Sequence, residues 1–398
     1  AMHISLTRNI TIPDRIRLAR FQKSPELGPR ILFFSGGTAL RDLSRTLINA
    51  THNSIHIITP FDSGGSSAEL RRVFNMPAVG DIRNRLMALA DQTVKGHPEI
   101  YALFSHRLPH RADQATLKEE FQSLVRGQHP NVANVPDPMR KIIKHHLDFF
   151  ARNMPEDFDL RGASLGNLVL TAGYLENDRH LDPVIFIYSK LVEVRGTVRP
   201  VVNVDAHLAA ELADGQRVVG QHLLTGKGSP ALKSAIKGMT LVRSLQEPAP
   251  MPVAIRDKVK AQIQSADLIC YPMGSFYTSL LANLLPEGVA RAVAETSCPK
   301  IYIPNTFEDP ECMGLDLQMQ VDRLLVQLLG RGYAPEDCSR VLNFILVDQD
   351  AQRYPGGVPA DFLKERGIDI MQTRLVTEDG AERIDPRLLA DILLSLSV

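Results

Sequence analysis

The pattern that recurs along this chain is first seen in Ile31-Leu32-Phe33-Phe34-Ser35-Gly36-Gly37-Thr38. Its first four residues are apolar and β-forming, and the glycine pair then favours a tight turn. Leu40, Leu43 and Leu47 follow at the spacing of one face of a helix. The segment therefore predicts a buried strand, a glycine turn and a helix, the repeating unit of a parallel α/β sheet.

The same order of strand, polar turn and helix recurs along the chain. Residues 55–59 are β-forming and end at a glycine- and serine-rich turn over 60–67. Further short strands are predicted at 268–271, 300–303 and 341–347, with helical stretches between them. Strands that alternate with helices indicate a parallel, doubly wound sheet. We therefore predict an α/β fold built on a three-layer, Rossmann-like, mostly parallel sheet.

Other segments depart from this alternation. Residues 95–160 contain several histidines and prolines and two helical stretches, which predicts a helical insertion. Residues 197–225 alternate like β-structure around Asp214-Gly215, a dipeptide typical of hairpins, which predicts a small antiparallel β segment. The run 184–188 has strand propensity, but Asp182-Pro183 before it is a good helix start, and we favour a buried helix.

These segments define the expected domain organisation. Residues 1–94 are expected to form an N-terminal arm and the first part of the Rossmann-like core. Residues 95–160 are expected to be the helical insertion, and residues 161–398 the remainder of the core with a C-terminal extension. The whole is then one discontinuous domain, which suits the length of the chain.

Composition and charge narrow the classes of partner. Lys+Arg and Asp+Glu number 45 each and Trp is absent, which argues against a nucleic-acid-binding module. No apolar run is long enough to cross a bilayer, and no leader segment is recognised, so we expect a cytoplasmic chain without a membrane partner. The four cysteines form no CxxC pair, and we interpret them as ordinary buried thiols.

Four glycine- and serine-rich turns carry the expected chemistry. At the start of a helix, backbone N–H groups lack intrahelical partners and the helix dipole adds positive charge, so a phosphate is favoured there. Glycine lets the backbone approach the ligand closely. A single such turn is more often a simple cap, but four of them predict a shared crevice at the carboxyl edge of the sheet. The residues expected to bind the ligand there are Gly36, Gly37 and Thr38; Ser63, Gly64, Gly65, Ser66 and Ser67; Ser164 and Asn167; and Gly274, Ser275, Tyr277 and Thr278.

Charged residues beside these turns extend the expected site. Asp62 lies in the second turn, where phosphates repel a carboxylate unless it binds Mg²⁺ or a ligand hydroxyl. It is therefore the candidate catalytic residue and metal ligand, and a helix cap is the alternative. Arg83 and Asn84 stand at another predicted helix start and can reach a diphosphate or a base, whereas Asp81 is either a further ligand group or a cap. Neither a GxGxxG fingerprint nor a Walker A motif is present, which disfavours an ordinary dehydrogenase or a P-loop NTPase.

Together these motifs resemble the superfamily of 2-phospho-L-lactate transferase (CofD) and the YvcK-type proteins once called gluconeogenesis factors. The resemblance implies a Rossmann-like fold, a nucleotide-linked ligand and Mg²⁺. The ligand is GDP-linked in the transferase branch, and a UDP-sugar or a dinucleotide such as NAD(P) in the YvcK-type branch. The matching stretches span most of residues 31–310, and they are Ser35 to Thr38, Asp62 to Ser67 with Gly80 to Asn84, Ser164 to Asn167, and Gly274 to Ser279.

Two functions stay open at this point. The first is an enzyme, a Mg²⁺-dependent transferase that moves a phosphate-linked group from a nucleotide donor, with Asp62 holding the metal. The second is a non-catalytic regulatory protein that senses a UDP-sugar or NAD(P) and signals to a protein partner. The retained Asp62 favours the enzyme, and Ser63, where the family has a second aspartate, favours the sensor. The sequence also leaves a homodimer open.

Overall fold

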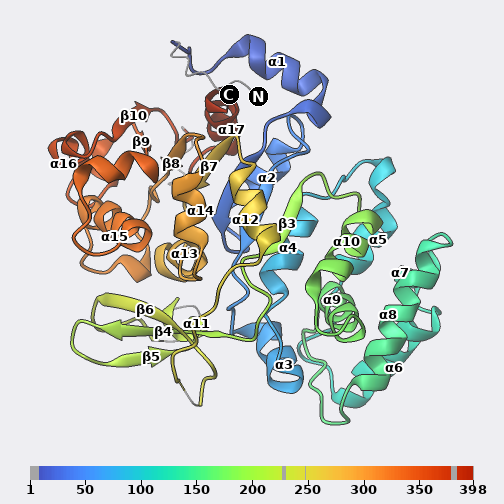
Figure 1. Ribbon diagram of the computed structural model, residues 1–398. Coiled ribbons are helices and arrows are strands. Elements are labelled where there is room, and N and C mark those ends of the chain that lie inside the picture. Colours follow the sequence, from blue (N-terminus) through green and yellow to red (C-terminus); the bar gives the residue numbers. More distant parts are fainter. Residues whose placement is uncertain (1–8, 226–229, 247, 378–382, 398) are drawn as a thin grey trace.

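The computed structural model describes residues 9–225, 230–246, 248–377 and 383–397. Within them, a seven-stranded sheet has the order β10-β9-β8-β7-β1-β2-β3, and every pairing is parallel (Figure 1). The predicted Rossmann-like α/β sheet is thus confirmed. Its strands are β1 (Ile31–Ser35), β2 (Ile55–Ile58), β3 (Thr197–Pro200), β7 (Leu268–Tyr271), β8 (Lys300–Tyr302), β9 (Phe344–Asp348) and β10 (Asp369–Thr373).

The order of the strands reverses at β1. The chain passes from β1 outward to β2 and β3, and it returns to β7 on the other side of β1 before it continues to β8, β9 and β10. In open parallel sheets, ligands bind outside the carboxyl ends of the strands at such a reversal. The turns that follow β1, β2 and β7 all lie at this edge.

Helices cover both faces of the sheet. In β1, Leu32 and Phe34 face one core cluster and Ile31 and Phe33 face another. This burial on both sides explains why the strands are continuous apolar runs rather than alternating ones. The first face is covered by α12 (Asp257–Gln264), α14 (Val289–Glu295) and α15 (Leu317–Leu329), and the second by α1 (Arg15–Lys23), α2 (Arg41–Leu47) and α17 (Pro386–Leu396).

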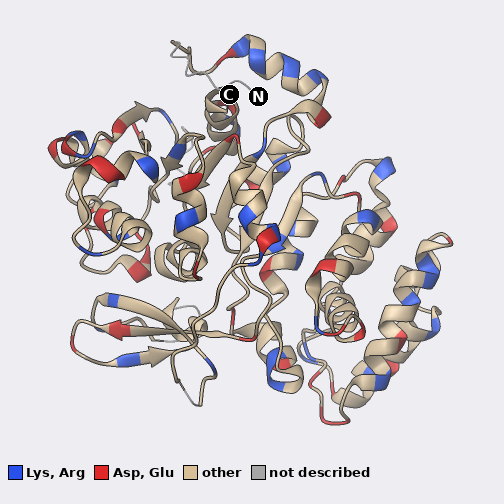
Figure 2. Cartoon of the chain, viewed as in Figure 1, with Lys and Arg blue, Asp and Glu red and all other residues tan. Residues whose placement is uncertain are grey.

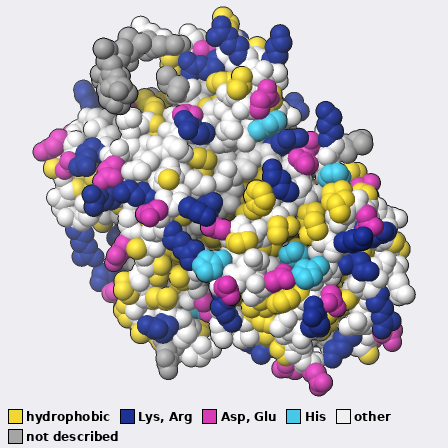
Figure 3. All heavy atoms as spheres, turned by 45° about the vertical axis from the view of Figure 1, so that its right-hand side comes forward, with side chains coloured by type: hydrophobic (Ala, Val, Ile, Leu, Met, Phe, Trp, Pro, Cys, Tyr) yellow, Lys and Arg dark blue, Asp and Glu magenta, His cyan; other side chains and the backbone are white. Residues whose placement is uncertain are grey.

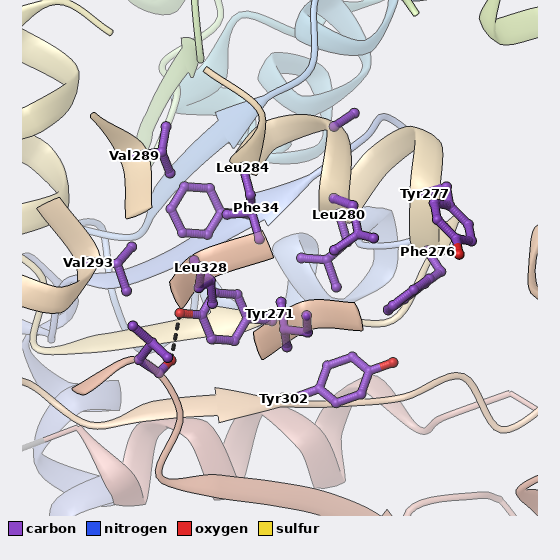
Figure 4. Close-up of a cluster of buried hydrophobic side chains, with 14 of the residues drawn as sticks. Phe34, Tyr271, Phe276, Tyr277, Leu280, Leu284, Val289, Val293, Tyr302 and Leu328 are labelled. Atoms are coloured by element: carbon purple, nitrogen blue, oxygen red, sulfur yellow. Dashed lines mark hydrogen bonds between the residues drawn. The ribbon is translucent and has the colours of Figure 1, made fainter. Parts of the chain in front are cut away.

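Aromatic side chains fill the first of these clusters. Figure 4 shows Phe34, Tyr271 and Tyr302 beside aliphatic residues of the covering helices. The Tyr271 hydroxyl donates a hydrogen bond of 2.7 Å to the carbonyl of Val341, so its polar end is satisfied inside the core.

A third cluster joins the β2–β3 edge to a group of helices on the right of Figure 1. The favoured helix over 184–188 is found as α10, whose buried residues include Leu181, Val184, Ile185 and Tyr188 at helical spacing. The helices are α3 (Gly65–Phe74), α4 (Gly80–Ala88), α5 (Pro98–Ser105), α6 (Gln114–Arg126), α7 (Pro130–Ala133), α8 (Met139–Asn153), α9 (Leu165–Glu176) and α10 (Leu181–Leu191).

A small antiparallel sheet of order β5-β4-β6 lies apart from the main one. It contains β4 (His207–Leu212), β5 (Arg217–Val219) and β6 (Ile236–Val242), and the predicted Asp214-Gly215 hairpin joins the first two. Two details differ from expectation. Residues 197–200 pair in parallel with β2 in the main sheet, and β6 carries too weak an alternation around Gly238 to be recognised from the sequence.

Short elements complete the described chain. They are α11 (Gln221–Leu224), the π-helix η3 (Phe276–Leu281) that runs into α13 (Ala282–Leu284), α16 (Ala360–Glu365), and 3₁₀ turns at Pro25–Leu27, Val94–Gly96, Pro310–Cys312, Pro335–Arg340 and Ala351–Arg353. Among the described helices, none combines the length and the apolar character that a bilayer crossing requires. Figure 2 shows acidic and basic residues interspersed over the molecule.

Candidate functional site

The second glycine turn leads directly into α3. Gly64 is the N-cap, and Gly65 has a φ of +54°, a left-handed conformation that favours glycine. Asp62 Oδ1 accepts a hydrogen bond of 3.0 Å from the Gly64 N–H, which folds the carboxylate back over the turn. The amides of Ser66 and Ser67 belong to the first turn of α3, where N–H groups have no intrahelical partner. This turn therefore offers donors and one carboxylate at the same place.

Gly80, the first residue of α4, marks the point where three turns meet. A Cβ at this position would lie 2.8 Å from Ser67 Oγ, 3.9 Å from Asp62 Oδ2 and 4.0 Å from Asn167 Nδ2. These neighbours come from α3, from the turn after β2 and from α9. Polar groups from two turns about a hundred residues apart, and the start of α4, thus meet at one glycine that has no side chain to separate them.

The third turn caps α9 and leaves one buried polar atom without a partner. Ser164 is the N-cap and its hydroxyl accepts a hydrogen bond of 3.4 Å from the Asn167 N–H. The Asn167 side chain is 1 % exposed, and its Nδ2 donates to Ser66 Oγ at 3.3 Å. Its Oδ1 has no hydrogen-bond partner among the described residues. Buried polar atoms are normally paired, so this unpaired oxygen marks Asn167, which also borders the cavity described next, as a residue whose amide can turn toward a ligand.

A cavity of about 660 Å³ opens between these helix starts. Both basic and acidic side chains border it. The basic ones are Arg83, Arg107, His110 and Arg161, and the acidic ones are Asp62, Glu69, Asp81 and Asp159. The residues of its lining that the sequence predicted are Asp62, Gly64, Gly65, Ser66, Ser67, Asp81, Arg83, Asn84, Ser164 and Asn167. The lining residues around 107–110 and 158–162 were missed, because they belong to no motif and lie far along the chain.

The two best-placed arginines of the cavity are incompletely paired. Arg83 is buried, and its Nη2 donates to Asn84 Oδ1 at 2.7 Å while its Nε has no partner among the described residues. Arg107 Nη1 donates to Ser66 Oγ at 3.3 Å and to the carbonyl of Gly162 at 3.0 Å. Burial lowers the pKa of both guanidinium groups, which nevertheless stay charged at neutral pH. An anion in the cavity would supply the countercharge.

Two buried arginines donate hydrogen bonds to backbone carbonyls of the first and second turns. Arg71 is 4 % exposed; it donates to the carbonyl of Asp62 at 3.1 Å and to Asp205 Oδ1 at 2.6 Å. Arg85 is fully buried and donates to the carbonyl of Gly36 at 2.9 Å, and burial lowers its pKa to about 10. Neither was predicted, because an arginine in an amphipathic helix is by default expected at the surface.

The first turn lies next to the cavity rather than in its lining. A Cβ on Gly37 would approach Asp81 Oδ1 to 2.1 Å, so only glycine allows this carboxylate to pack against the turn. A Cβ on Gly36 would meet Ser279 Oγ at 2.4 Å, which brings the fourth turn close as well. Thr38 is exposed.

The fourth turn has its amides occupied from within the chain. Gly274 N–H donates to Asn305 Oδ1 at 2.9 Å, and the N–H groups of Tyr277 and Thr278 both donate to Glu311 Oε2 at 2.9 Å. Burial and the nearby Asp309 raise the pKa of Glu311 to about 7. The expected binding residues Gly274, Ser275, Tyr277 and Thr278 therefore do not line the cavity, and a carboxylate takes the place expected for phosphate.

Ser63 also faces away from the cavity. Its hydroxyl lies 2.7 Å from His222 Nδ1 in α11, and it accepts a hydrogen bond of 3.3 Å from the His222 N–H. The side chain that follows Asp62 is thereby tied to the segment after the small antiparallel sheet.

Comparison with known proteins assigns the sequence to a family. The family model described as 2-phospho-L-lactate transferase CofD matches residues 31–376. The chain belongs to the CofD family. This confirms the resemblance found in the sequence, and the matched range contains all four turns and the cavity, which two of the turns border together with the start of α4.

Curated and solved relatives agree with this assignment. The putative gluconeogenesis factor of Nostoc sp. is 32% identical over 92% of this chain and 68% of its own length, and the gluconeogenesis factor of Bacillus subtilis is 30% identical over 92% and 98%. A crystal structure of a member of the UPF0052 family from Bacillus halodurans matches with a TM-score of 0.66 at 25% identity, and it covers 92% of this chain and 99% of that one.

Proposed function

We propose that the cavity binds a small molecule linked to a nucleoside diphosphate. The observation that carries this proposal is the meeting of three turns around Gly80, which directs helix starts and polar side chains at one space. The volume of about 660 Å³ lies within the usual range for small-molecule sites, roughly 300–1,000 Å³. The diphosphate is suggested by the amides of the first turn of α3 and by Arg83 and Arg107, and the nucleotide by membership in the CofD family.

The donor set fits a Mg²⁺ ion that is shared with ligand phosphates. Mg²⁺ usually takes one or two carboxylates, and phosphate oxygens and water complete its octahedron. Asp62 and Asp81 both border the cavity, and Asp62 Oδ2 is the oxygen that faces Gly80. A bound Mg²⁺ would neutralise charge on the transferred phosphate group. Asp62 would hold it, while the α3 amides and the two arginines orient the diphosphate. On this basis we propose transfer of a phosphate-linked group as the activity.

A regulatory function is the second candidate, and one contact favours it. The Ser63–His222 bond links the turn that would touch the ligand to α11. A ligand that binds two conformations of this turn unequally would shift their populations and move α11 with it. In this case the chain would sense a UDP-sugar or NAD(P) and present a changed surface to a protein partner, without catalysis.

Thermal shift with GDP, UDP-N-acetylglucosamine and NAD, each with and without Mg²⁺, tests the proposal. A ligand at 100 times its Kd adds about 2.7 kcal/mol of stability, which raises the Tm of a chain of this length by roughly 3 °C. Transfer predicts that Mg²⁺ strengthens binding, that Asp62→Asn removes this gain, and that mass spectrometry finds a product. The control Asp137→Asn alters an exposed carboxylate in the described structure, away from the cavity, and should change nothing.

The other outcomes are equally informative. Ligand binding that does not depend on Mg²⁺, with no product found, supports the regulatory function. Absence of any shift across the panel would overturn the proposed nucleotide-linked ligand. Identical shifts in Asp62→Asn and wild type, for a ligand whose binding depends on Mg²⁺, would overturn the assignment of Asp62.

A further inference from the structure

Three side chains of the types that bind metals gather within residues 95–160, and the first of them, His106, directly precedes the cavity residue Arg107. His106 follows the end of α5, Glu120 lies in α6, and His129 is the N-cap of α7. Each offers one ligand atom, and these atoms all lie within 4.8 Å of one another. His106 Nε2 and Glu120 Oε1 are 3.1 Å apart. All three residues are half-buried, so an ion can reach them from solvent.

From this geometry we propose a binding site for a divalent transition metal of the zinc class at His106, Glu120 and His129. Zinc bonds to nitrogen and oxygen are about 2.0–2.2 Å long, and tetrahedral ligands are then about 3.3 Å apart. The spacing of His106 and Glu120 already meets this value. His129 offers a ligand atom within 4.8 Å of the other two, so zinc binding would require it to move closer to them, and water would complete the fourth position.

His129 supplies the one interaction that metal binding has to replace. Its Nδ1 accepts a hydrogen bond from the Asn131 N–H at 3.2 Å, a long distance for such a bond. Coordination by either ring nitrogen of the neutral imidazole removes this acceptor. A long capping bond is weak compared with a metal–imidazole bond, so the exchange favours the metal.

The plainer explanation is a His–Glu ion pair without a metal. The chain offers a comparison, because His145 and Glu176 form such a pair at 2.6 Å in which the histidine is about half exposed. Among the described residues, that pair belongs to no group of three ligands. Figure 3 turns this helical side of the molecule forward and shows histidines close to acidic side chains on its surface. The third ligand, His129, is what separates the proposed site from an ordinary pair.

The metal would fasten three helices to the wall of the ligand cavity. The carbonyl of His106 accepts a hydrogen bond of 3.1 Å from the Leu165 N–H in the first turn of α9. The next residue, Arg107, borders the cavity and bonds Ser66. A bound ion therefore fixes the backbone from which Arg107 projects. This function is independent of the identity of the ligand.

The test uses the full chain, stripped with a chelator and titrated with Zn²⁺ alone. Calorimetry and native mass spectrometry should find one ion per chain, Co²⁺ should give the visible absorption of a tetrahedral complex, and hydrogen exchange over 98–133 should slow on binding. Glu120→Gln and His129→Gln are each expected to weaken binding by at least about tenfold. His145→Gln is the matched control and should bind as the wild type does.

Two results would overturn the site. One is the absence of stoichiometric Zn²⁺ binding, and the other is affinity that survives both ligand variants or falls equally in the control. Circular dichroism of each variant without metal verifies the fold, and both ligand changes are conservative replacements at half-buried positions. A variant that folds and binds Zn²⁺ unchanged counts against the proposal.

Discussion

Asn167→Leu is expected to stabilise the free protein while it weakens ligand binding. Asn167 is 1 % exposed, and its Oδ1 has no partner among the described residues. A buried polar atom left unpaired costs about 1–3 kcal/mol, whereas the hydrogen bond of Nδ2 to Ser66 at 3.3 Å contributes about 1 kcal/mol or less. Leucine has nearly the same shape as asparagine, and it removes both the cost of the unpaired oxygen and the contribution of the hydrogen bond to Ser66. The expected net change is a gain of about 1 kcal/mol in the free energy of unfolding.

Binding should move in the opposite direction. An amide that hydrogen-bonds the ligand contributes about 1 kcal/mol, so its loss weakens affinity about fivefold. Stabilities are compared by urea denaturation and by Tm, which changes by roughly 1 °C per kcal/mol for a chain of this length. Affinity is measured by calorimetry with the ligand that the thermal-shift panel identifies. Asn153→Leu, at an exposed position of α8, is the matched control and should leave affinity unchanged.

The sign of the stability change separates two explanations of Asn167. If the residue is present for ligand binding, the free protein tolerates or prefers leucine. If it is present to hold α9 against α3, the variant loses stability and keeps its affinity. A less stable variant with unaltered affinity would refute the assignment of this cavity.

Two further predictions concern the groups that support the turns. Arg71→Met should destabilise the protein by about 3–5 kcal/mol in urea denaturation, because it leaves the half-buried carboxylate of Asp205 and the carbonyls of Asp62 and Ala206 without their donor. Arg72→Met, at the exposed neighbouring position, should have little effect, and equal midpoints for both variants would contradict this reasoning. Glu311 has a folded pKa of about 7, above the ordinary value of 4.5, so the folded state binds the extra proton and stability falls as pH rises from about 4.5 to about 7. The isosteric variant Glu311→Gln has no such group to titrate, so its stability does not fall in this way. The Tm of the variant minus that of the wild type should therefore increase as the pH rises from about 4.5 to about 7. Burial lowers the pKa of His207 to about 4, so its titration makes stability rise with pH, but it does so equally in both proteins and cancels when their Tm values are subtracted. A difference in Tm between Glu311→Gln and wild type that does not change with pH would exclude the proposed titration of Glu311.

Much of the fold could be predicted because its signals are local. The strand–turn–helix units around Gly36 and Gly64 depend on neighbours a few residues apart, and so does the choice of a helix for 184–188. The parallel pairing of residues 197–200 with β2 was missed, because the sequence of a four-residue strand carries no information about which strand it pairs with. The edge strand β6 was missed for a related reason: its pairing with β4, rather than its own propensity, makes it a strand.

The site was predictable only in part. Polar groups of the turns near Asp62, Asp81 and Ser164 do converge on one cavity, as the rule for parallel sheets suggests. The fourth turn has the same kind of sequence, yet its amides are bonded to Glu311. No local pattern reveals this, since the carboxylate arrives from more than thirty residues away.

The sequence alone determined which segments become strands, turns and helices, and which family they resemble, because periodicity and glycine conformation act between near neighbours. Tertiary structure decided which helix starts remain open to a ligand and which charged side chains, such as Arg71 and Arg107, reach them. The physical reason is that a backbone N–H bonds whichever acceptor the folded chain brings within about 3 Å, and contacts between distant segments choose that acceptor.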